Sequence, residues 1–351
     1  RVIELVESSG IGWNWWTYKK YDTITTIASV PITKNYKSIL DYWAGNIPKP
    51  STEICLNGLM EMAEKLLFKN CEIKRDVIAS LIDPSYRLES KPFKNNIIPG
   101  SIALADYDLG ALGLSYMDYD YMRTGVGDQI SGGNTGWSYR NDGVDIEPST
   151  DTTIIPFNIG WTQPGEFMNY TINVIKEGDY SFTVRSASEI NTSSVTIFLG
   201  QEKIIEALDL PNTGGVQIWK DTLLGEAFLP KGEQIISLRI NRPGANLKLL
   251  KIQSKEADRG LKIFDYKLYP NPMSDRIKIE YTSLVNTEVK VSIYNINGQR
   301  VWSKTHKALA GDNSILWSGK NMNANILSSG IYFISLDDGH KKIQEKITLI
   351  R

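Results

Sequence analysis

The sequence predicts a mainly β protein with two β-sandwich modules, preceded by a short α/β segment. Three observations lead to this prediction. Short runs of alternating apolar and polar residues, separated by Gly, Asn and Pro turns, fill most of the chain after residue 97. Apolar spacing of three and four residues, which is typical of amphipathic helices, occurs in the first 95 residues. The length of 351 residues leaves room for two or three domains.

Composition excludes some classes of partner. The formal net charge is −1, so there is no basic excess to neutralise phosphates, and we expect no nucleic-acid partner. No apolar run approaches the roughly 18 residues that span a bilayer, so we expect no membrane span. Nine Trp and 17 Tyr fit a secreted sugar-binding protein, and they also fit aromatic sandwich cores. We expect a monomer. Because the chain starts at Arg1 in an apparent helix, we expect a fragment of a longer protein, with processing as the alternative.

Cysteine and histidine usage excludes several kinds of site. Cys55 and Cys71 flank a helical run whose ends lie roughly 20 Å apart, too far for them to pair with each other. They are expected to be buried thiols or partners of segments outside this chain. His306 and His340 are the only histidines. We therefore expect neither a multi-histidine zinc site nor a Ser-His-Asp triad, and no cofactor.

Residues 1–95 are expected to form one strand among helices. Apolar spacing predicts helices over Arg1–Ser8, Tyr36–Trp43, Ile54–Phe68 and Asp76–Ile82. The tryptophan-rich run Ile11–Tyr18 is expected to be a strand. One strand among helices cannot bury both of its faces, so we expect this segment to be one strand–helix unit of a larger α/β structure.

The motif GIGWNWWTYKK resembles the eighth strand of family 5 glycoside hydrolases, which are (β/α)8 barrels, and the following helices resemble the closing helix. A complete barrel takes about 250 residues, so residues 1–95 would be its C-terminal remnant. The resemblance implies that Trp16 forms the floor of a sugar subsite, with Trp13 and Trp15 as alternatives and simple packing as another explanation. A further possibility is that this segment is an independent helical domain.

No catalytic residue is assigned from the resemblance. A retaining glycosidase needs two carboxyl groups about 5–5.5 Å apart. In family 5 they end strands four and seven, which would precede Arg1. The acids that remain, such as Glu4, Glu7, Asp41, Glu61, Glu64 and Asp76, are expected on helix surfaces or in loops. We therefore expect this chain to be inactive as a hydrolase.

Residues 97–254 are expected to form the first sandwich, with strands such as Tyr180–Arg185, Val195–Leu199 and Ile235–Ile240. The most informative stretch is NIGWTQPGEFMNYTINV, which predicts two strands around a Pro164-Gly165 turn. Trp161 lies beside that turn, at the rim, where an exposed indole offers a flat plate to the C–H face of a sugar ring.

Six motifs in order resemble the family 6 carbohydrate-binding modules: IPGSIALADYD, YRNDGVDIE, IGWTQPGEFMNYTINV, GDYSFTVRSAS, LPNTGGVQIW and PGANLKLLKI. The family clamps a sugar between two aromatic plates and an asparagine on the loops at one sandwich edge. The resemblance implies that Trp161 is the first plate and Asn246 the asparagine. Val216 occupies the place of the second plate, and Trp219 either substitutes for that plate or is structural.

Tyr139, Arg140 and Trp137 are weaker candidates from the same resemblance. They either border the edge or serve the concave-face site that some members use, and packing explains them equally well. The family often carries a structural calcium bound by glutamates in this region. Here Ala103 and Ala105 stand where the carboxylates would be, while Asp106 and Asp108 remain, so we do not assign a metal site.

Residues 255–265 are expected to be a polar linker, and residues 266–351 a small all-β module with strands Ile277–Tyr281, Val289–Tyr294 and Ile331–Leu336. Asn297-Gly298 and Asp338-Gly339 are hairpin signals. The motifs YKLYPNPMSDRIKIEY, VSIYNINGQRV and SSGIYFISL resemble the C-terminal sorting domain of type IX secretion. That resemblance implies recognition by the type IX machinery and a secreted, outer-surface location.

Two functions follow as hypotheses. The first is the polysaccharide-binding and anchoring portion of an extracellular glycoside hydrolase acting on β-linked plant-type glycans, a cellulase-like endo-glucanase or a mannanase. The second is a non-enzymatic, adhesin-like surface protein that binds glycans. In both, the expected partners are a β-linked polysaccharide and the secretion machinery.

Overall fold

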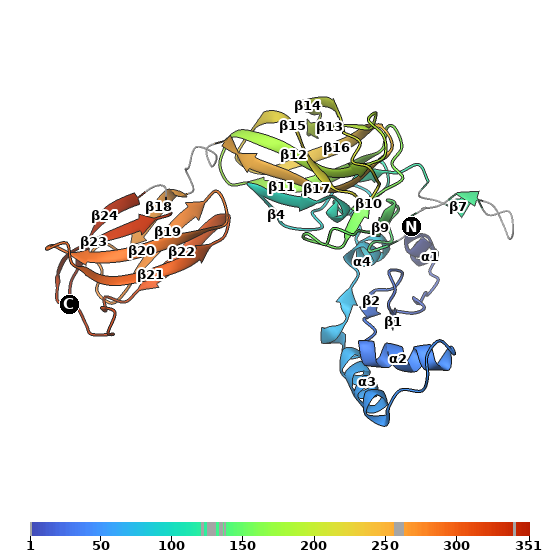
Figure 1. The fold of residues 1–351 in the computed structure, drawn as a ribbon, viewed down its shortest axis with the longest axis horizontal. Helices are drawn as coiled ribbons and strands as arrows, with labels where there is room; N and C mark the ends of the chain where they lie inside the picture. The colour runs from blue at the N-terminus through green and yellow to red at the C-terminus, as the bar shows by residue number, and fades with distance from the viewer. Residues whose placement is uncertain are drawn as a thin grey trace.

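The computed structural model describes residues 2–120, 123–124, 131–132, 136, 138–255, 263–339 and 342–351. Figure 1 shows three parts in chain order: a segment with the helices, a central β-sandwich and a C-terminal β module that contains the C-terminus. The protein is mainly β with few helices. Most of the expected linker, together with Trp137 and His340, lies outside the described residues.

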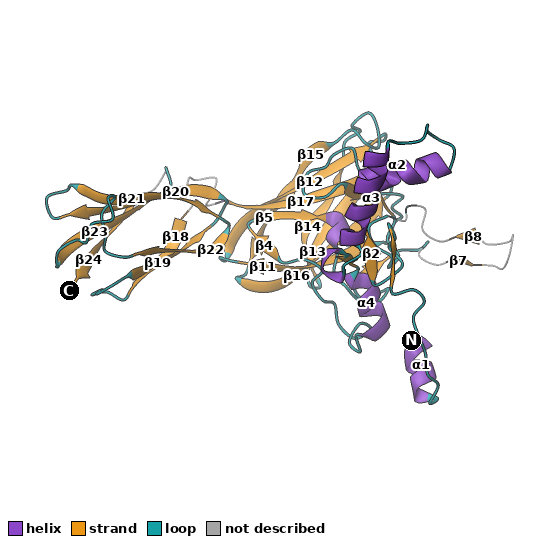
Figure 2. Ribbon diagram, turned by 90° about the horizontal axis from the view of Figure 1, so that it is seen from below, coloured by secondary structure: helices purple, strands orange, loops and turns teal. Residues whose placement is uncertain are grey.

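The four predicted helices are confirmed, and Figure 2 shows that they belong to the first segment. Their bounds are α1 (Val2–Ser8), α2 (Lys34–Trp43), α3 (Thr52–Lys65) and α4 (Arg75–Ile82), with a 3-10 turn at Phe68–Asn70. Two of them begin at hydroxyl caps, because Thr33 accepts from the Tyr36 amide and Ser51 from the Ile54 amide. These caps explain why the helices begin before the first apolar residue of each pattern.

The predicted strand over Ile11–Tyr18 is wrong, because residues 11–18 are loop and turn. Strand β1 (Lys19–Tyr21) follows instead and pairs in parallel with β2 (Ala28–Val30), which pairs antiparallel with β3 (Glu72–Ile73). A strand forms only where a neighbouring strand pairs with it. Because β2 is three residues long and pairs with residues 19–21, residues 11–18 have no partner strand among the described residues. The tryptophans are correspondingly exposed, Trp16 to 89%.

The central sandwich consists of two sheets that enclose one apolar core. The first sheet has the order β15-β12-β17-β10-β9, and β5 also pairs with β17; the second has the order β14-β13-β16-β11-β4, and β6 also pairs with β11. Alternating residues such as Phe182 and Val184 on β12, and Tyr170 and Ile172 on β11, point into the core. The strands predicted for residues 97–254 are confirmed.

The first sheet contains β15 (Lys220–Leu229), β12 (Gly178–Ser188), β17 (Ala245–Ser254), β10 (Phe157–Ile159), β9 (Ile146–Pro148) and β5 (Gly100–Ala103). The second contains β14 (Glu202–Asp209), β13 (Ser194–Leu199), β16 (Gly232–Arg242), β11 (Phe167–Val174), β4 (Asn96–Ile98) and β6 (Tyr116–Met117). A 3-10 turn covers Leu104–Asp106, and β7 (Arg123–Thr124) pairs with β8 (Ser131–Gly132).

Helix α4 packs against the sandwich. The expected surface position of Asp76 is wrong, because this side chain is buried between α4 and the sandwich. Its carboxylate accepts a hydrogen bond from the Asn141 amide at 2.8 Å. Ala79, Phe93 and Leu109 form a small apolar cluster between the two parts. The segment from α4 to Phe93 is therefore joined to the sandwich by packing as well as by the chain.

The C-terminal module packs a three-stranded sheet, β18-β19-β22, against a four-stranded sheet, β21-β20-β23-β24. Gly298 and Gly339 have φ of +74° and +85°, as the predicted hairpin turns require. The strands expected here are confirmed. The bounds are β18 (Ile263–Tyr269), β19 (Ile277–Ser283), β20 (Thr287–Asn295), β21 (Arg300–Ala308), β22 (Gly311–Trp317), β23 (Gly330–Asp337) and β24 (Lys342–Leu349).

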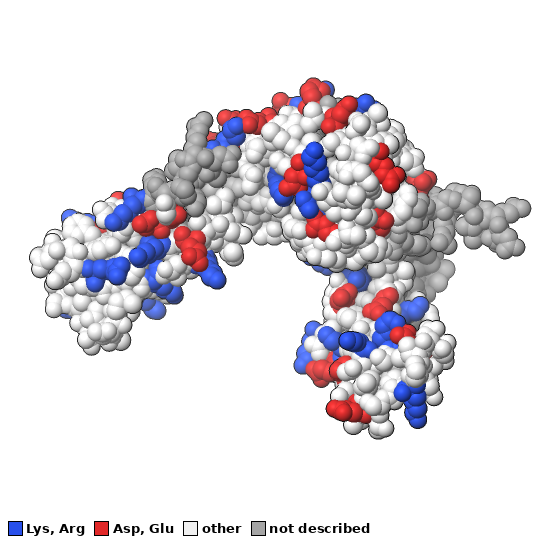
Figure 3. Space-filling model, in the orientation of Figure 1, with Lys and Arg blue, Asp and Glu red and all other residues white. Residues whose placement is uncertain are grey.

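Surface charge does not separate by sign on the face drawn in Figure 3, where basic and acidic residues are interspersed over all three parts. Among the described residues, no helix has the length and apolar character needed to cross a bilayer.

Candidate functional site

Trp161 lies two residues after β10 and is 47% exposed. Its φ of +45° is in the left-handed region, which costs a bulky residue about 1–3 kcal/mol and often marks a functional position. A Cβ added to Gly136 would lie 2.5 Å from the Trp161 indole. The indole thus rests against a residue that has to be glycine, while nearly half of the side chain stays open to solvent.

A row of polar side chains crosses three neighbouring strands beside Trp161. Register pairs Glu147 of β9 with Asn158 of β10, and Asn246 is the second residue of the next strand, β17. The Glu147 Oε1 atom accepts from Asn246 Nδ2 at 2.6 Å and from Asn158 Nδ2 at 3.1 Å. A Cβ at Gly160 would lie 3.0 Å from Asn246 Oδ1. The structure therefore places Asn246 next to the residue that precedes Trp161.

The loop between β14 and β15 closes this row. Asn246 Nδ2 also donates to the Val216 carbonyl at 2.8 Å, and Gln217 Nε2 donates to Glu147 Oε1 at 2.8 Å. Val216 and Ile218 are 44% and 56% exposed. The exposed side chains of this loop are therefore aliphatic, whereas the resemblance implies an aromatic ring at this place.

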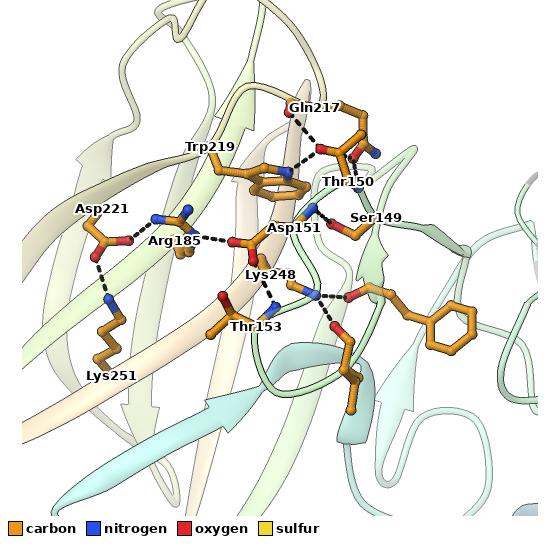
Figure 4. Close-up of polar contacts among 12 residues, drawn as sticks. Ser149, Thr150, Asp151, Thr153, Arg185, Gln217, Trp219, Asp221, Lys248 and Lys251 are labelled. Carbon is orange, nitrogen blue, oxygen red and sulfur yellow. Dashed lines mark hydrogen bonds and ion pairs between the residues drawn. The ribbon is translucent and has the colours of Figure 1, made fainter.

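Trp219 braces that loop. Its Nε1 donates to Thr150 Oγ1 at 3.2 Å, and the Thr150 hydroxyl donates to the Gln217 carbonyl at 3.0 Å. Figure 4 shows these contacts beside the ion pairs of Arg185 with Asp151 and with Asp221. With its indole N–H bonded and its side chain partly buried, Trp219 has the contacts of a structural residue.

Tyr139, Arg140 and Trp16 make their contacts away from Trp161, and Arg140 is wrong as an edge residue because it is buried. The Tyr139 ring stacks on Phe157 at 4.9 Å, and its hydroxyl donates to Asp106 at 2.5 Å. Trp137 lies outside the described residues. Trp16 belongs to the first segment, where it borders a groove of about 400 Å³ with Leu66 and Lys20.

The two aspartates of IALADYD are engaged by protein groups. Asp106 accepts from Tyr139, and the buried Asp108 accepts from the Thr171 amide and hydroxyl at 2.9 and 2.6 Å. Burial raises the pKa of both carboxyl groups. Within the described part of the chain, no three His, Cys, Asp or Glu side chains are grouped so that they could hold a metal ion.

Sequence reasoning missed two buried acids near the turn that carries Trp161, Asp118 and Glu166, and the buried Asp145 lies with them. Glu166 accepts from the Gln163 amide at 2.7 Å, and Asp145 accepts from the Gly136 amide at 3.1 Å. These bonds fix the turn and the glycine against which the indole rests. Burial raises the pKa of Asp118 to about 7, and the charges of Glu166 and Asp145 add to this effect.

Replacing Asp118 with asparagine is expected to remove part of the pH dependence of stability. Because the folded pKa lies above the ordinary 3.8, the native state binds more protons than the unfolded state between these values. Native stability should therefore fall as pH rises from about 4 to about 7, by at most about 4 kcal/mol. The Asp118→Asn variant should be the more stable protein at pH 8, measured by urea unfolding. A wild-type stability that stays level from pH 5 to pH 8 would contradict this.

Comparison with known proteins bears on two regions of the chain. Among solved structures, it is similar to a carbohydrate-binding module from Cellvibrio mixtus lichenase 5A in complex with cellotriose, with 21% identity over 44% of this chain and 95% of that one, and a TM-score of 0.31. A C-terminal family 6 module of LamC from Zobellia galactanivorans shows 27% identity over 31% and 86%, with a TM-score of 0.29. A β-1,3-glucan-binding family 6 module from Bacillus halodurans shows 17% identity over 46% and 100%, with a TM-score of 0.32.

No curated protein matches the chain. Two family models do: "Carbohydrate binding module (family 6)" over residues 137–253, and "Secretion system C-terminal sorting domain" over residues 267–350. The first covers the strands that carry Trp161, Glu147 and Asn246, and the second covers the C-terminal module. The chain therefore contains a family 6 carbohydrate-binding module followed by a type IX secretion C-terminal sorting domain, and it is a secreted, cell-surface protein.

Proposed function

We propose that the sandwich edge formed by Trp161, Asn246 and Glu147 binds a β-linked polysaccharide. The observation that carries the proposal is the half-exposed indole, in a strained backbone conformation, directly beside an asparagine whose amide is locked by Glu147. The apolar C–H face of a sugar would cover the indole, and its hydroxyls would donate to the free oxygens of the amide row. This combination of one flat apolar surface and a few placed polar atoms is what sugar sites require.

The side chains of the loop beside Asn246 set the expected strength of binding. Val216 and Ile218 offer apolar area to a sugar ring but no π face. Aromatic contacts add about 0.5–1.5 kcal/mol beyond the buried area, so one missing plate lowers affinity by roughly three- to tenfold. We expect a weak module whose contribution is to raise the local concentration of whatever is joined to it.

We further propose that the chain is the binding and export portion of a glycoside hydrolase that acts on β-linked plant-type glycans, an endo-glucanase or a mannanase. The first segment supports this, because its exposed large apolar side chains outnumber its buried ones among the described residues. Such a surface fits the edge of a larger α/β layer better than an independent domain. In this proposal, Trp16 lines a hydrolase subsite, and the catalytic carboxylates are not among residues 1–95.

The test is binding of the full chain to a panel of soluble neutral glycans: hydroxyethyl cellulose, β-1,3-glucan, xylan and glucomannan. Affinity electrophoresis should show retardation by at least one of them, and a reducing-sugar assay should show no hydrolysis. Retardation by none of the four would refute the glycan-binding proposal. Hydrolysis would refute the expected inactivity and leave the binding proposal standing.

Removing residues 263–351 is expected to prevent surface display. The sorting domain is the part that secretion machinery would read, whereas the sandwich has its own core and does not depend on it. In a bacterium with type IX secretion, the shortened protein should stay inside the outer membrane and resist external protease. The purified shortened protein should bind glycans as the full chain does. Surface display of the shortened protein would contradict the prediction.

A further inference from the structure

The amide row at the binding edge uses all of its side-chain N–H donors internally. The Asn246 amide donates to Glu147 and to the Val216 carbonyl. The Asn158 amide donates to Glu147 and to the Ile159 carbonyl. The Gln217 amide donates to Glu147 and to the Asn158 side-chain oxygen. The orientation of each amide follows from chemistry, because a carboxylate is an acceptor and only the NH₂ group can face it. Three amides therefore converge on one oxygen, Glu147 Oε1.

The groups of this row that stay available to a ligand are hydrogen-bond acceptors. Among the described residues, no hydrogen bond reaches Glu147 Oε2 or Asn246 Oδ1, and neither atom belongs to the buried polar atoms without a partner. Both oxygens therefore reach solvent. The Gln217 Oε1 atom is occupied by the Thr150 amide at 3.0 Å. A ligand thus meets free acceptors but no free side-chain donor from Asn158, Asn246 or Gln217.

The nearby cations are engaged elsewhere. Lys248 is buried, and its ammonium donates to the carbonyls of Ile155 and Phe157, the latter at 2.9 Å. Arg185 bridges Asp151 and Asp221 (Figure 4). Within the described residues, no Lys or Arg forms an ion pair with Glu147. The negative charge of that side chain is therefore left to face the ligand.

We infer that this edge selects neutral, hydroxyl-rich glycans and rejects glycans that carry a carboxylate or sulfate on the bound sugar, and that Gln217 is the positioning residue that makes it selective. The inference rests on the proposed function of the edge. A hydroxyl can donate to Glu147 Oε2 or Asn246 Oδ1. An anionic group brings only acceptors, so it meets an acceptor and a like charge and loses its water without replacement. Gln217 orients the other side chains of the row, because its amide donates to both Glu147 Oε1 and Asn158 Oδ1.

The experiment uses the full chain and pairs of glycans that share a backbone: hydroxyethyl with carboxymethyl cellulose, β-1,3-glucan with its carboxymethyl derivative, and mannan with polymannuronate. Calorimetry should show binding to a neutral member at least about tenfold tighter than to its anionic counterpart. The preference should persist in 0.5 M NaCl, where long-range repulsion is screened but contact at the site is not. Equal or tighter binding of the anionic member would overturn the inference and leave the binding proposal intact. Binding to no glycan in any pair would overturn both.

Two variants test the residues. The Glu147→Gln variant removes the charge and keeps the size, so the neutral-to-anionic preference should fall from about tenfold toward unity. The Gln217→Leu variant should weaken neutral binding several-fold and lower the preference with it, because Glu147 and Asn158 lose their shared donor. Gln253→Leu is the matched control, since Gln253 is exposed at the far end of β17. An unchanged preference in Glu147→Gln, or an equal effect of Gln253→Leu, would assign the selectivity elsewhere.

Discussion

Replacing Trp161 with alanine is expected to abolish detectable glycan binding without unfolding the protein. The indole is 47% exposed and rests against Gly136, so it is a surface plate and not part of the core. Covering about 100 Å² of such a plate contributes roughly 2.5 kcal/mol, and aromatic contact adds about 1 kcal/mol. Because the exposed side chains of the loop beside Asn246, Val216 and Ile218, are aliphatic, no second ring compensates, and affinity should fall by more than about 100-fold.

Two variants frame the measurement. Trp161→Tyr keeps a flat ring and should retain retardation within several-fold of wild type. Trp43→Ala removes a more exposed indole, 68% open at the end of α2, and should leave retardation on neutral glycans unchanged. Far-ultraviolet circular dichroism checks that each variant keeps its sheets. Retardation of Trp161→Ala equal to that of wild type would place the glycan site elsewhere on the chain.

Local patterns were sufficient for most of the fold. Alternation of apolar residues found strands such as β12 and β16, because each strand keeps one face in the core, but each predicted strand was two or three residues short at both ends. The same reasoning placed Trp161 at the rim from the nearby Pro164-Gly165 turn. It failed at Ile11–Tyr18, where a strand-like composition has no neighbouring strand to pair with. Composition predicts the preference for a strand, whereas pairing decides whether one forms.

The polar row of the site was beyond the reach of local patterns. Glu147 meets Gln217 and Asn246 across sequence separations of 70 and 99 residues. Their meeting depends on the order β17-β10-β9 and on the loop before β15, neither of which periodicity specifies. The available signal was three polar residues, Glu147, Asn158 and Asn246. They lie on the face opposite the core residues of the same strands, where alternation treats them as ordinary surface positions. The function assigned to each remains a prediction until binding is measured.

Replacing Arg140 with methionine is expected to cost the largest amount of stability of any change considered, about 3–5 kcal/mol. The side chain is 1% exposed. Its Nε donates to Asp142 at 3.1 Å, and its guanidinium stacks 3.7 Å from the centre of the Tyr107 ring. Methionine fills much of the space but leaves the buried Asp142 carboxylate without a cation. For a sandwich of about 150 residues, this corresponds to a melting point roughly 6–20 °C lower by calorimetry.

The matched control is Arg242→Met, which breaks the exposed ion pair with Asp209 and should cost less than about 1 kcal/mol.

The pH dependence of the stability loss separates the contribution of charge from that of packing. Burial raises the pKa of Asp76, Asp142 raises it further, and Arg140 opposes both effects. Without Arg140, this pKa rises again, so the native state binds more protons and the loss of stability should grow as pH increases from about 4 to 7. A loss that is the same at both ends of that range would mean that Arg140 acts through packing alone. Because Asp76 holds helix α4 to the sandwich through the Asn141 amide, the variant should also release the first segment to protease before the sandwich unfolds.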